Sequence, residues 1–117
     1  MNADQWVELE KTHNALFVKG NNGSGIELCG SPGWLPMVTV LLEKLAKLGN
    51  VKVNIIKEKY GCLRIQCHTV QSDVASALID LVEDLSAKTC STCGKAGEIR
   101  NMSGWYVALC QECMAKK

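Results

Sequence analysis

Val51-Lys-Val-Asn-Ile-Ile-Lys-Glu-Lys-Tyr-Gly-Cys-Leu-Arg-Ile-Gln-Cys-His-Thr69 is the stretch that decides the fold of this chain. Apolar and polar residues alternate on either side of Lys59-Tyr-Gly61, which is the pattern of two strands that each bury one face. Gly61 can adopt the positive φ that a tight turn requires. The stretch therefore predicts a β-hairpin with strands at 51–58 and 63–69.

Helical spacing of apolar residues flanks this hairpin on both sides. In residues 4–17, positions 6, 9, 13 and 16 predict a first helix. Gly30-Ser-Pro-Gly-Trp34 opens a second helix that ends at Gly49, and Ser72 caps a third. The stripes expected to be buried are Trp34, Val38, Leu41, Leu45 and Leu48 in the second helix, and Val74, Leu78, Leu81 and Leu85 in the third.

A short strand at Ile26–Cys29 completes the expected sheet. These elements predict an α+β fold, with a three-stranded, mainly antiparallel sheet packed by three helices and a strand order that stays open. The glycine-rich loop at 19–25 does not predict phosphate binding, because a strand and not a helix follows it. Extra apolar residues on the second helix predict a central helix or one covered by another chain, such as a second copy; they are Met37, Val40 and Leu42.

Four cysteines near the end of the chain predict a metal site. Cys90 and Cys93 form one C-x-x-C pair, and Cys110 and Cys113 form another. Two such pairs on a hairpin-length linker can supply four thiolates to one tetrahedral zinc ion. Because sulfur fills all four positions, the ion is expected to be structural, with no place for water or substrate. Redox chemistry of the pairs, and a cluster or a different metal, are the alternatives.

The segments around these cysteines predict a zinc-finger module at residues 89–117, appended to an α+β domain at residues 1–88. Gly97–Asn101 and Trp105–Leu109 predict two short strands, and the second cysteine pair begins a short helix. A knuckle, a hairpin and a helix-borne pair favour a treble-clef-like arrangement, with a zinc ribbon as the rival. No linker separates the third helix from Cys90, so we expect the module to dock rigidly on the end of that helix.

Composition is that of an ordinary soluble protein, with 47% hydrophobic and 21% charged residues. The formal net charge of +1 becomes about −1 once four thiolates and a zinc ion are counted, so general attraction to nucleic acid is not indicated. No stretch approaches the roughly 20 apolar residues of a membrane span, and the N-terminus does not resemble a secretion signal. Three further cysteines are expected as free thiols in a reducing, cytoplasmic compartment: Cys29, Cys62 and Cys67.

No constellation of residues predicts catalysis. A treble-clef nuclease would need histidines within the cysteine module. The two histidines of this chain, His13 and His68, both lie outside it. Cys67 and His68 are neighbours on a strand, so they point to opposite faces and cannot act as nucleophile and base. We therefore expect a protein that is not an enzyme.

Four motifs in a fixed order carry a family resemblance. They are Gly33-Trp34, Ile56-Lys-Glu-Lys-Tyr-Gly-Cys-Leu-Arg64, Cys90-x-x-Cys-Gly94, and Gly104-Trp105 ahead of Leu109-Cys-x-x-Cys113. Across residues 28–114 the chain resembles a family of small bacteriophage and prophage proteins with a C-terminal zinc finger. Cys62 departs from the pattern, which has a second glycine there. The resemblance implies an accessory protein that binds a host or phage protein complex in a bacterial cell, for example to inhibit a defence system.

Two groups of residues are candidate partner-binding surfaces. Large side chains on the hairpin of the cysteine module favour protein binding, although they could instead just cover the metal; they are Met102, Trp105 and Tyr106. The alternative function is nucleic-acid binding by the basic hairpin of residues 57–64, with Lys57, Lys59 and Arg64 for phosphates and Tyr60 for stacking on a base. Residues 1–87 hold more acidic than basic side chains, so any basic patch is local.

Overall fold

The computed structural model describes residues 3–18, 25–28 and 31–116. These residues form four α-helices, five strands and two short 3₁₀ helices. The elements in chain order are α1 (Ala3–Thr12), a 3₁₀ helix (Asn14–Leu16), β1 (Gly25–Glu27), a 3₁₀ helix (Pro32–Trp34), α2 (Leu35–Leu48), β2 (Val51–Lys59), β3 (Cys62–Val70), α3 (Asp73–Ser86), β4 (Glu98–Met102), β5 (Trp105–Leu109) and α4 (Gln111–Ala115). Among these described residues no helix combines the length and the apolar character that crossing a membrane requires.

The main sheet has three strands in the order β1-β2-β3, and it is mixed. β2 and β3 pair antiparallel, as the hairpin predicts, whereas β1 pairs parallel with β2, with Gly25 opposite Ile55. The expectation of a mainly antiparallel sheet was therefore wrong for its short strand. The reason is the connection: α2 carries the chain back along the sheet between β1 and β2, so the two strands run the same way. Cys29, the last residue of the expected strand, lies outside the described residues.

The β2–β3 hairpin is confirmed, together with its turn. Tyr60 and Gly61 have φ values of 55° and 85°, the two positive angles of a type I′ turn. The Gly61 N–H donates to Oε2 of Glu58 at 2.8 Å, which closes the tip from the strand side.

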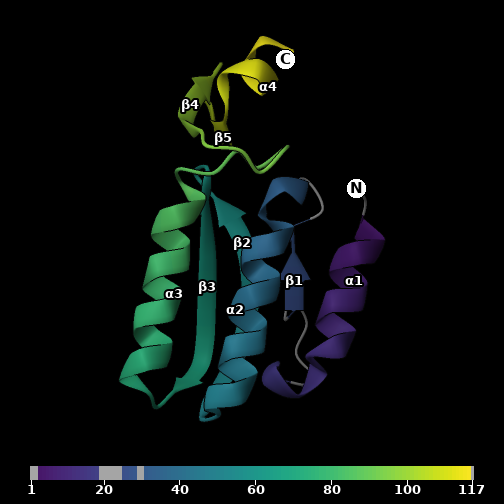
Figure 1. The fold of residues 1–117 in the computed structure, drawn as a ribbon, viewed down its shortest axis with the longest axis vertical. Helices are drawn as coiled ribbons and strands as arrows, with labels where there is room; N and C mark the ends of the chain where they lie inside the picture. The colour runs from purple at the N-terminus through teal and green to yellow at the C-terminus, as the bar shows by residue number, and fades with distance from the viewer. Residues whose placement is uncertain (1–2, 19–24, 29–30, 117) are drawn as a thin grey trace.

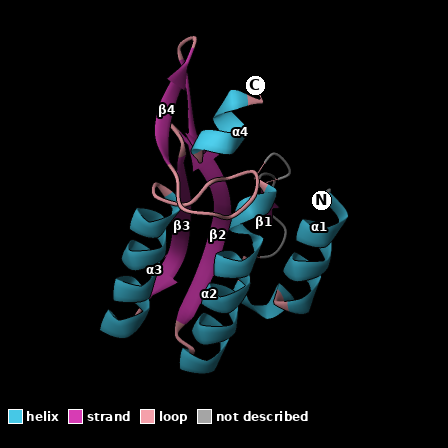
Figure 2. Cartoon of the chain, turned by 45° about the horizontal axis from the view of Figure 1, so that its top comes forward, coloured by secondary structure: helices cyan, strands magenta, loops and turns pink. Residues whose placement is uncertain are grey.

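One face of the sheet is covered by α2 and α3, which lie side by side in front of it, while α1 lies beside β1 at the outer edge (Figure 1). Figure 2 shows the same layering with β2 and β3 behind the helices. The core between the layers is mostly aliphatic, and its fully covered members include Trp34, Val38, Leu42, Leu45, Val53, Ile56 and Leu63. On the opposite face of β3, Arg64, Gln66 and His68 are exposed, as alternation requires.

The first helix is shorter than the sequence pattern predicts, because it ends at Thr12 and not at residue 17. The chain then passes through the 3₁₀ helix and reaches β2, where Phe17 forms a parallel bridge with Val53. The Val18 N–H donates to the Val53 carbonyl at 3.0 Å. Pairing with the edge of β2 needs extended backbone, and this ends the helical path that the apolar spacing alone would continue.

α3 is rotated relative to the sequence prediction. Ser72 caps it as expected, with its side chain accepting from the Ala75 N–H at 3.2 Å. Three members of the predicted buried stripe are exposed, however: Val74 at 57%, Leu81 at 61% and Leu85 at 46%. Ala75, Ile79 and Ser86 face the sheet in their place.

Two hydrogen bonds to the edge strand explain this rotation. The Leu63 N–H donates to the Ser86 hydroxyl and the Ile65 N–H donates to a Glu83 carboxylate oxygen, both at 2.8 Å. β3 is an edge strand, so its outward N–H groups have no neighbouring strand to pair with and need other acceptors. Satisfying those groups fixes which side of α3 meets the sheet, and an apolar stripe is left facing outward.

Candidate metal centre

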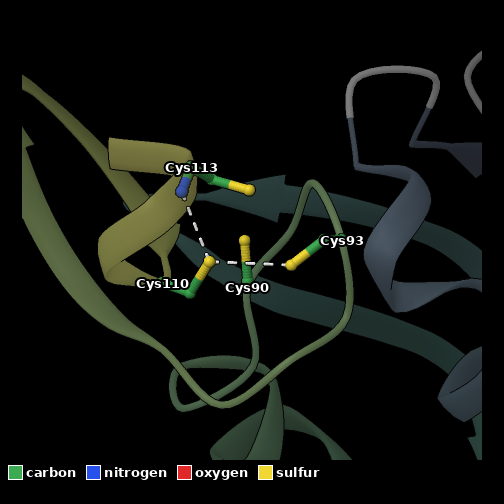
Figure 3. Close-up of side chains that lie close together, drawn as sticks. All are labelled: Cys90, Cys93, Cys110 and Cys113. Atoms are coloured by element: carbon green, nitrogen blue, oxygen red, sulfur yellow. Dashed lines mark hydrogen bonds between the residues drawn. The ribbon is translucent and has the colours of Figure 1, made fainter. Parts of the chain in front are cut away.

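The four cysteines of the two C-x-x-C pairs meet at one point. Their Sγ atoms all lie within 4.8 Å of one another, and the residues are free cysteines with no disulfide among them. Figure 3 shows Cys90 and Cys93 on the loop that follows α3, facing Cys110 and Cys113 at the start of α4. Four closely spaced thiols of this kind fit a site for one metal ion.

Local backbone geometry positions the first pair. The Gly94 N–H donates to the Cys90 carbonyl at 3.0 Å, and the Cys90 N–H donates to the Lys95 carbonyl at 2.7 Å, so the loop folds back on itself. Gly94 has a φ of 87°, which a residue with a side chain rarely adopts. The turn therefore holds both thiols on its inner side.

The second pair is positioned by a hairpin and a helix. β4 and β5 pair antiparallel through a turn at Ser103 and Gly104, and the Gly104 N–H donates to Oδ1 of Asn101 at 2.7 Å. β5 leads directly to Cys110, the N-cap of α4, whose Sγ accepts from the Cys113 N–H at 3.4 Å (Figure 3). These elements match the expected knuckle, hairpin and helix-borne pair.

Charges at the site favour a bound cation. Burial is the largest single influence on the pKa of Cys90, and it raises that pKa. The backbone N–H groups of Cys110, Cys93 and Thr92 together outweigh burial and lower the pKa to about 6. The N–H of Cys113 is the main reason that the pKa of Cys110 is lowered. Hydrogen bonding with the Cys110 thiol, followed by burial, raises the pKa of Cys113 to about 12. Four adjacent thiols cannot all ionise alone, and a divalent cation supplies the charge that lets them do so.

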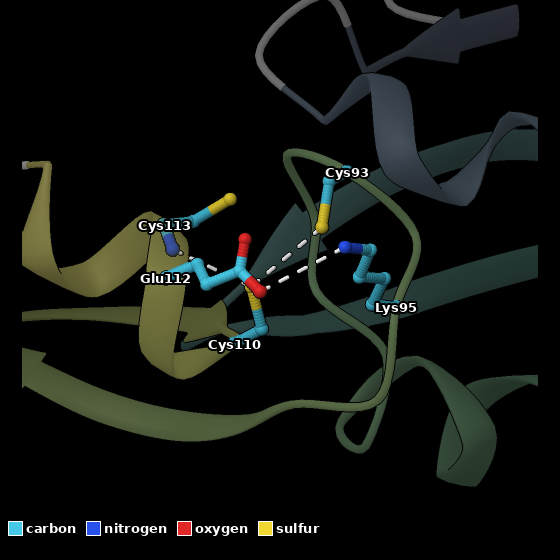
Figure 4. A network of polar contacts seen from close by, with 5 residues as sticks. All are labelled: Cys93, Lys95, Cys110, Glu112 and Cys113. Carbon is cyan, nitrogen blue, oxygen red and sulfur yellow. Dashed lines mark hydrogen bonds and ion pairs between the residues drawn. The ribbon is translucent and has the colours of Figure 1, made fainter.

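An ion pair bridges the two halves of the site. Lys95 Nζ lies 3.8 Å from Glu112 Oε1, joining the first loop to α4 beside the sulfur atoms (Figure 4). The two side chains are 68% and 75% exposed, so this pair contributes little to stability. The buried contacts of the module are instead those of Leu109 with Cys90, Cys110 and Cys113.

The loop that carries Cys90 and Cys93, which we call the metal loop, is bound to the main domain by Gly33 and Trp34. The Gly33 N–H donates to the Ser91 carbonyl at 2.6 Å, and Trp34 Nε1 donates to the Thr89 carbonyl at 3.0 Å. A Cβ atom on Gly33 would lie 2.6 Å from the Gly94 nitrogen, so no other residue fits without movement. The sequence marks Gly33-Trp34 as a helix opening, but it does not reveal this contact with the cysteine loop.

The predicted partner-binding residues fall into three places. Met102 is half-buried against the cysteines. It therefore covers the site, which is the alternative to protein binding that its sequence position left open. Trp105 and Tyr106 are 71% and 45% exposed and line a cleft together with Tyr60. Lys57 and Arg64 are direct cross-strand partners in the main sheet. Tyr60, which its sequence position places among the basic residues of the β2–β3 hairpin, thus lies beside the hairpin of the cysteine module.

Comparison with protein-family models, with curated proteins and with solved structures found no match to this chain.

Proposed function

We propose that the four cysteines bind one structural zinc ion in a treble-clef-like module. Zn–S bonds of about 2.3 Å in a tetrahedron place the sulfur atoms about 3.8 Å apart. The Cys93 and Cys110 sulfur atoms are 3.6 Å apart, close to that spacing. Four thiolates complete the coordination sphere, so the ion organises the chain and has no position for a substrate.

We further propose that the protein is not an enzyme and that it acts by binding another protein. The observation that carries this function is the outer face of α3, where Val74, Leu78, Leu81 and Leu85 follow one another at helical spacing. Leu78 is half-buried and the other three are exposed. Spacings of four, three and four residues are those of a helix that packs along another helix. Large apolar residues left in water along a whole helix favour a partner.

The stripe leads into a groove beside the metal loop. Leu85 lies at one wall of this groove, which has a volume of about 550 Å³. Pro36 and Met37 of α2 form a second wall, and Thr92 and Cys93 of the metal loop form a third. The zinc ion therefore supports the surface that we assign to the partner.

Charge indicates the kind of partner. Asp73, Asp80 and Asp84 are exposed on α3, and the helix contains no lysine or arginine. A second copy would bring these acidic residues against each other, which disfavours a homodimer through α3. An amphipathic helix with basic residues beside its apolar stripe complements the surface in both respects.

The resemblance to small phage and prophage proteins supports a biological setting for this binding. We propose an accessory protein that acts in the cytoplasm of a bacterial host, where it occupies a basic helical segment of a host or phage complex. Inhibition of a host defence complex is one such role.

Two synthetic helical peptides test the partner-binding face. They share one leucine stripe, flanked by lysines in the first and by glutamates in the second, and fluorescence anisotropy measures their binding to the zinc-loaded protein. We expect the lysine peptide to bind and Leu81→Asp to weaken it about tenfold, since burial of one leucine contributes about 1.5–3 kcal/mol. Val7→Asp, at a 47% exposed site on α1, is the matched control. Equal binding of both peptides, or a homodimer that Leu81→Asp dissolves, would contradict the assignment.

Nucleic-acid binding is the second candidate function, and the pairing of Lys57 with Arg64 favours it. Both side chains lie on the same face of the sheet, with Lys59 nearer the tip of the hairpin. The test is an affinity for single-stranded DNA that falls steeply with salt and that Arg64→Gln weakens. No binding at low salt would eliminate this candidate.

A further inference from the structure

A cleft lies between the tip of the β2–β3 hairpin and β5. Its outer part, about 310 Å³, is lined by Tyr60, Trp105, Tyr106 and Glu58. An adjoining part of about 280 Å³ shares Trp105, Tyr106 and Glu58 and continues inward to Glu27 and Ser31. The cleft is thus built from both domains, at the end of the sheet where the parallel strands β1 and β2 finish.

Aromatic side chains are concentrated at this cleft. The chain has six aromatic residues, counting phenylalanine, tryptophan and tyrosine, and four of them line its two parts: Tyr60, Trp105, Tyr106 and, in the inner part, the buried Trp34. Tyr60 and Trp105 are 65% and 71% exposed, whereas Trp6 and Trp34 are 2% and 0% exposed. Large rings held in water at a concave site are typical of a binding surface.

Carboxylates give the cleft its charge. Glu58 lines both parts and Glu27 lines the inner part. Within the described ranges, neither carboxylate has a basic group within 4.0 Å, since the ion pairs found there join Lys95 to Glu112 and Arg100 to Glu98. Glu58 is held in place because its Oε2 accepts the Gly61 N–H.

A cation of the chain already lies over one of these rings. Lys59 Nζ is 5.5 Å from the centroid of the Tyr60 ring, within the range of a cation–π interaction. The lysine shows that the ring is accessible to a cation, and it would compete with a cation from outside.

We propose that this cleft binds a lysine or arginine side chain of a partner peptide, with an aromatic face against the charged group and Glu58 as its counter-ion. The proposal rests on the protein-binding function and adds a second contact, separate from the α3 face. A nucleobase could also stack on Trp105, but the carboxylates repel the phosphate that accompanies it. Aromatic faces beside carboxylates match a cation in both respects.

Indole NMR signals provide the test. Three short blocked peptides that differ at one position, arginine, lysine or glutamine, are titrated into the ¹⁵N-labelled zinc-loaded protein, and guanosine monophosphate is titrated in parallel. We expect the Trp105 indole signal to move saturably with arginine and lysine but not with glutamine. The buried Trp6 indole, which lies outside the cleft, should stay still and serve as the internal control.

Variants separate a cationic ligand from a nucleotide. Glu58→Gln keeps an oxygen that can accept the Gly61 N–H, and should weaken the arginine peptide about two- to fivefold. Glu43→Gln, an exposed residue of α2, changes the net charge equally and should have no effect. Lys59→Gln should strengthen arginine binding by removing the competitor, whereas it would weaken a nucleotide.

Three outcomes would overturn the proposal: equal shifts with the glutamine peptide, no shift with arginine or lysine, or nucleotide binding that Lys59→Gln weakens. The short peptides carry no apolar stripe and so do not probe the α3 face. Failure of the cleft proposal is therefore distinguishable from failure of the proposed binding by α3.

Discussion

The sheet domain and the cysteine module are ordered by different forces. The domain buries a continuous aliphatic core between its sheet and α2 and α3. The second buried cluster, in the module, consists of Leu109 and three of the four cysteines, with partly buried residues around them. A cluster so small cannot offset the conformational entropy of ordering the module. One region thus folds by burying apolar surface, whereas we expect the other to depend on the metal ion that we propose for its four cysteines.

The strongest test of this difference removes a ligand. Cys93→Ser should abolish stoichiometric zinc binding, because three thiolates leave the coordination sphere open. Amide NMR signals of β4 and β5 should then collapse toward unfolded positions, while those of β2 and β3 stay dispersed. Cys67→Ser, a free cysteine outside the site, is the control. Full zinc content in Cys93→Ser, measured by elemental analysis, would show that the ligand assignment is wrong.

A methyl group at the junction should connect the two regions energetically. Gly33→Ala places a Cβ against the backbone of the metal loop, 2.6 Å from the Gly94 nitrogen, so the loop has to move. We expect about 1–3 kcal/mol of destabilisation in urea and faster transfer of zinc to a chelator.

Gly49→Ala is the matched control for this junction. Unlike Gly33, that glycine has a positive φ, of 71°, but it has no neighbour within 4 Å among the described residues. Backbone strain there should lower stability without changing the rate of zinc release. Equal release rates in the two variants would mean that the contact at Gly33 does not support the loop.

Within the sheet domain, the orientation of α3 depends on a buried hydroxyl group. Ser86 is fully buried and accepts the Leu63 N–H, so Ser86→Ala leaves that edge N–H without an acceptor. We expect a loss of about 1–2 kcal/mol in the free energy of unfolding, measured with urea. Ser76→Ala, on the exposed side of the same helix, should be close to neutral. If the two variants lose the same stability, the hydrogen bond does not set the rotation of α3.

Sequence patterns predicted the parts of the molecule that depend on near neighbours. Alternation around Gly61 was enough to place the β2–β3 hairpin, and C-x-x-C spacing was enough to bring four thiols together. The rotation of α3 could not be read in this way, because that helix has apolar residues on two sides. The choice between them is made by hydrogen bonds to β3, which only the folded sheet brings within reach.

Two other features depend on residues that are distant in sequence. The hydrogen bond from Trp34 to Thr89 spans 55 positions, and no local pattern signals it. The parallel pairing of β1 depends on the path of α2, which a three-residue strand does not encode. The cleft could not be predicted from the sequence for the same reason, because Tyr60 and Trp105 come from two hairpins that become adjacent only after folding.

The smallest expected effect concerns a cysteine outside the metal site. Burial, followed by the charge of Glu83, raises the pKa of Cys67 from its ordinary value of 9.0, whereas the pKa of Cys90 is lowered to about 6. Because only the thiolate reacts, alkylation of Cys67 by iodoacetamide should be slow at pH 8 and reach half its maximal rate above pH 9.0. Mass spectrometry of the zinc-loaded protein measures this rate peptide by peptide.

Glu83→Gln removes the charge but keeps an oxygen that can accept the Ile65 N–H. It should therefore shift the pH profile of Cys67 modestly toward lower pH, with burial still holding its pKa above the ordinary value. A Cys67 that reacts at pH 8 as fast as glutathione would contradict the contrast. In that case the sheet domain would not raise the pKa of a cysteine while the cysteine module lowers it. The sheet near α3 would then be more open to water than its packing indicates.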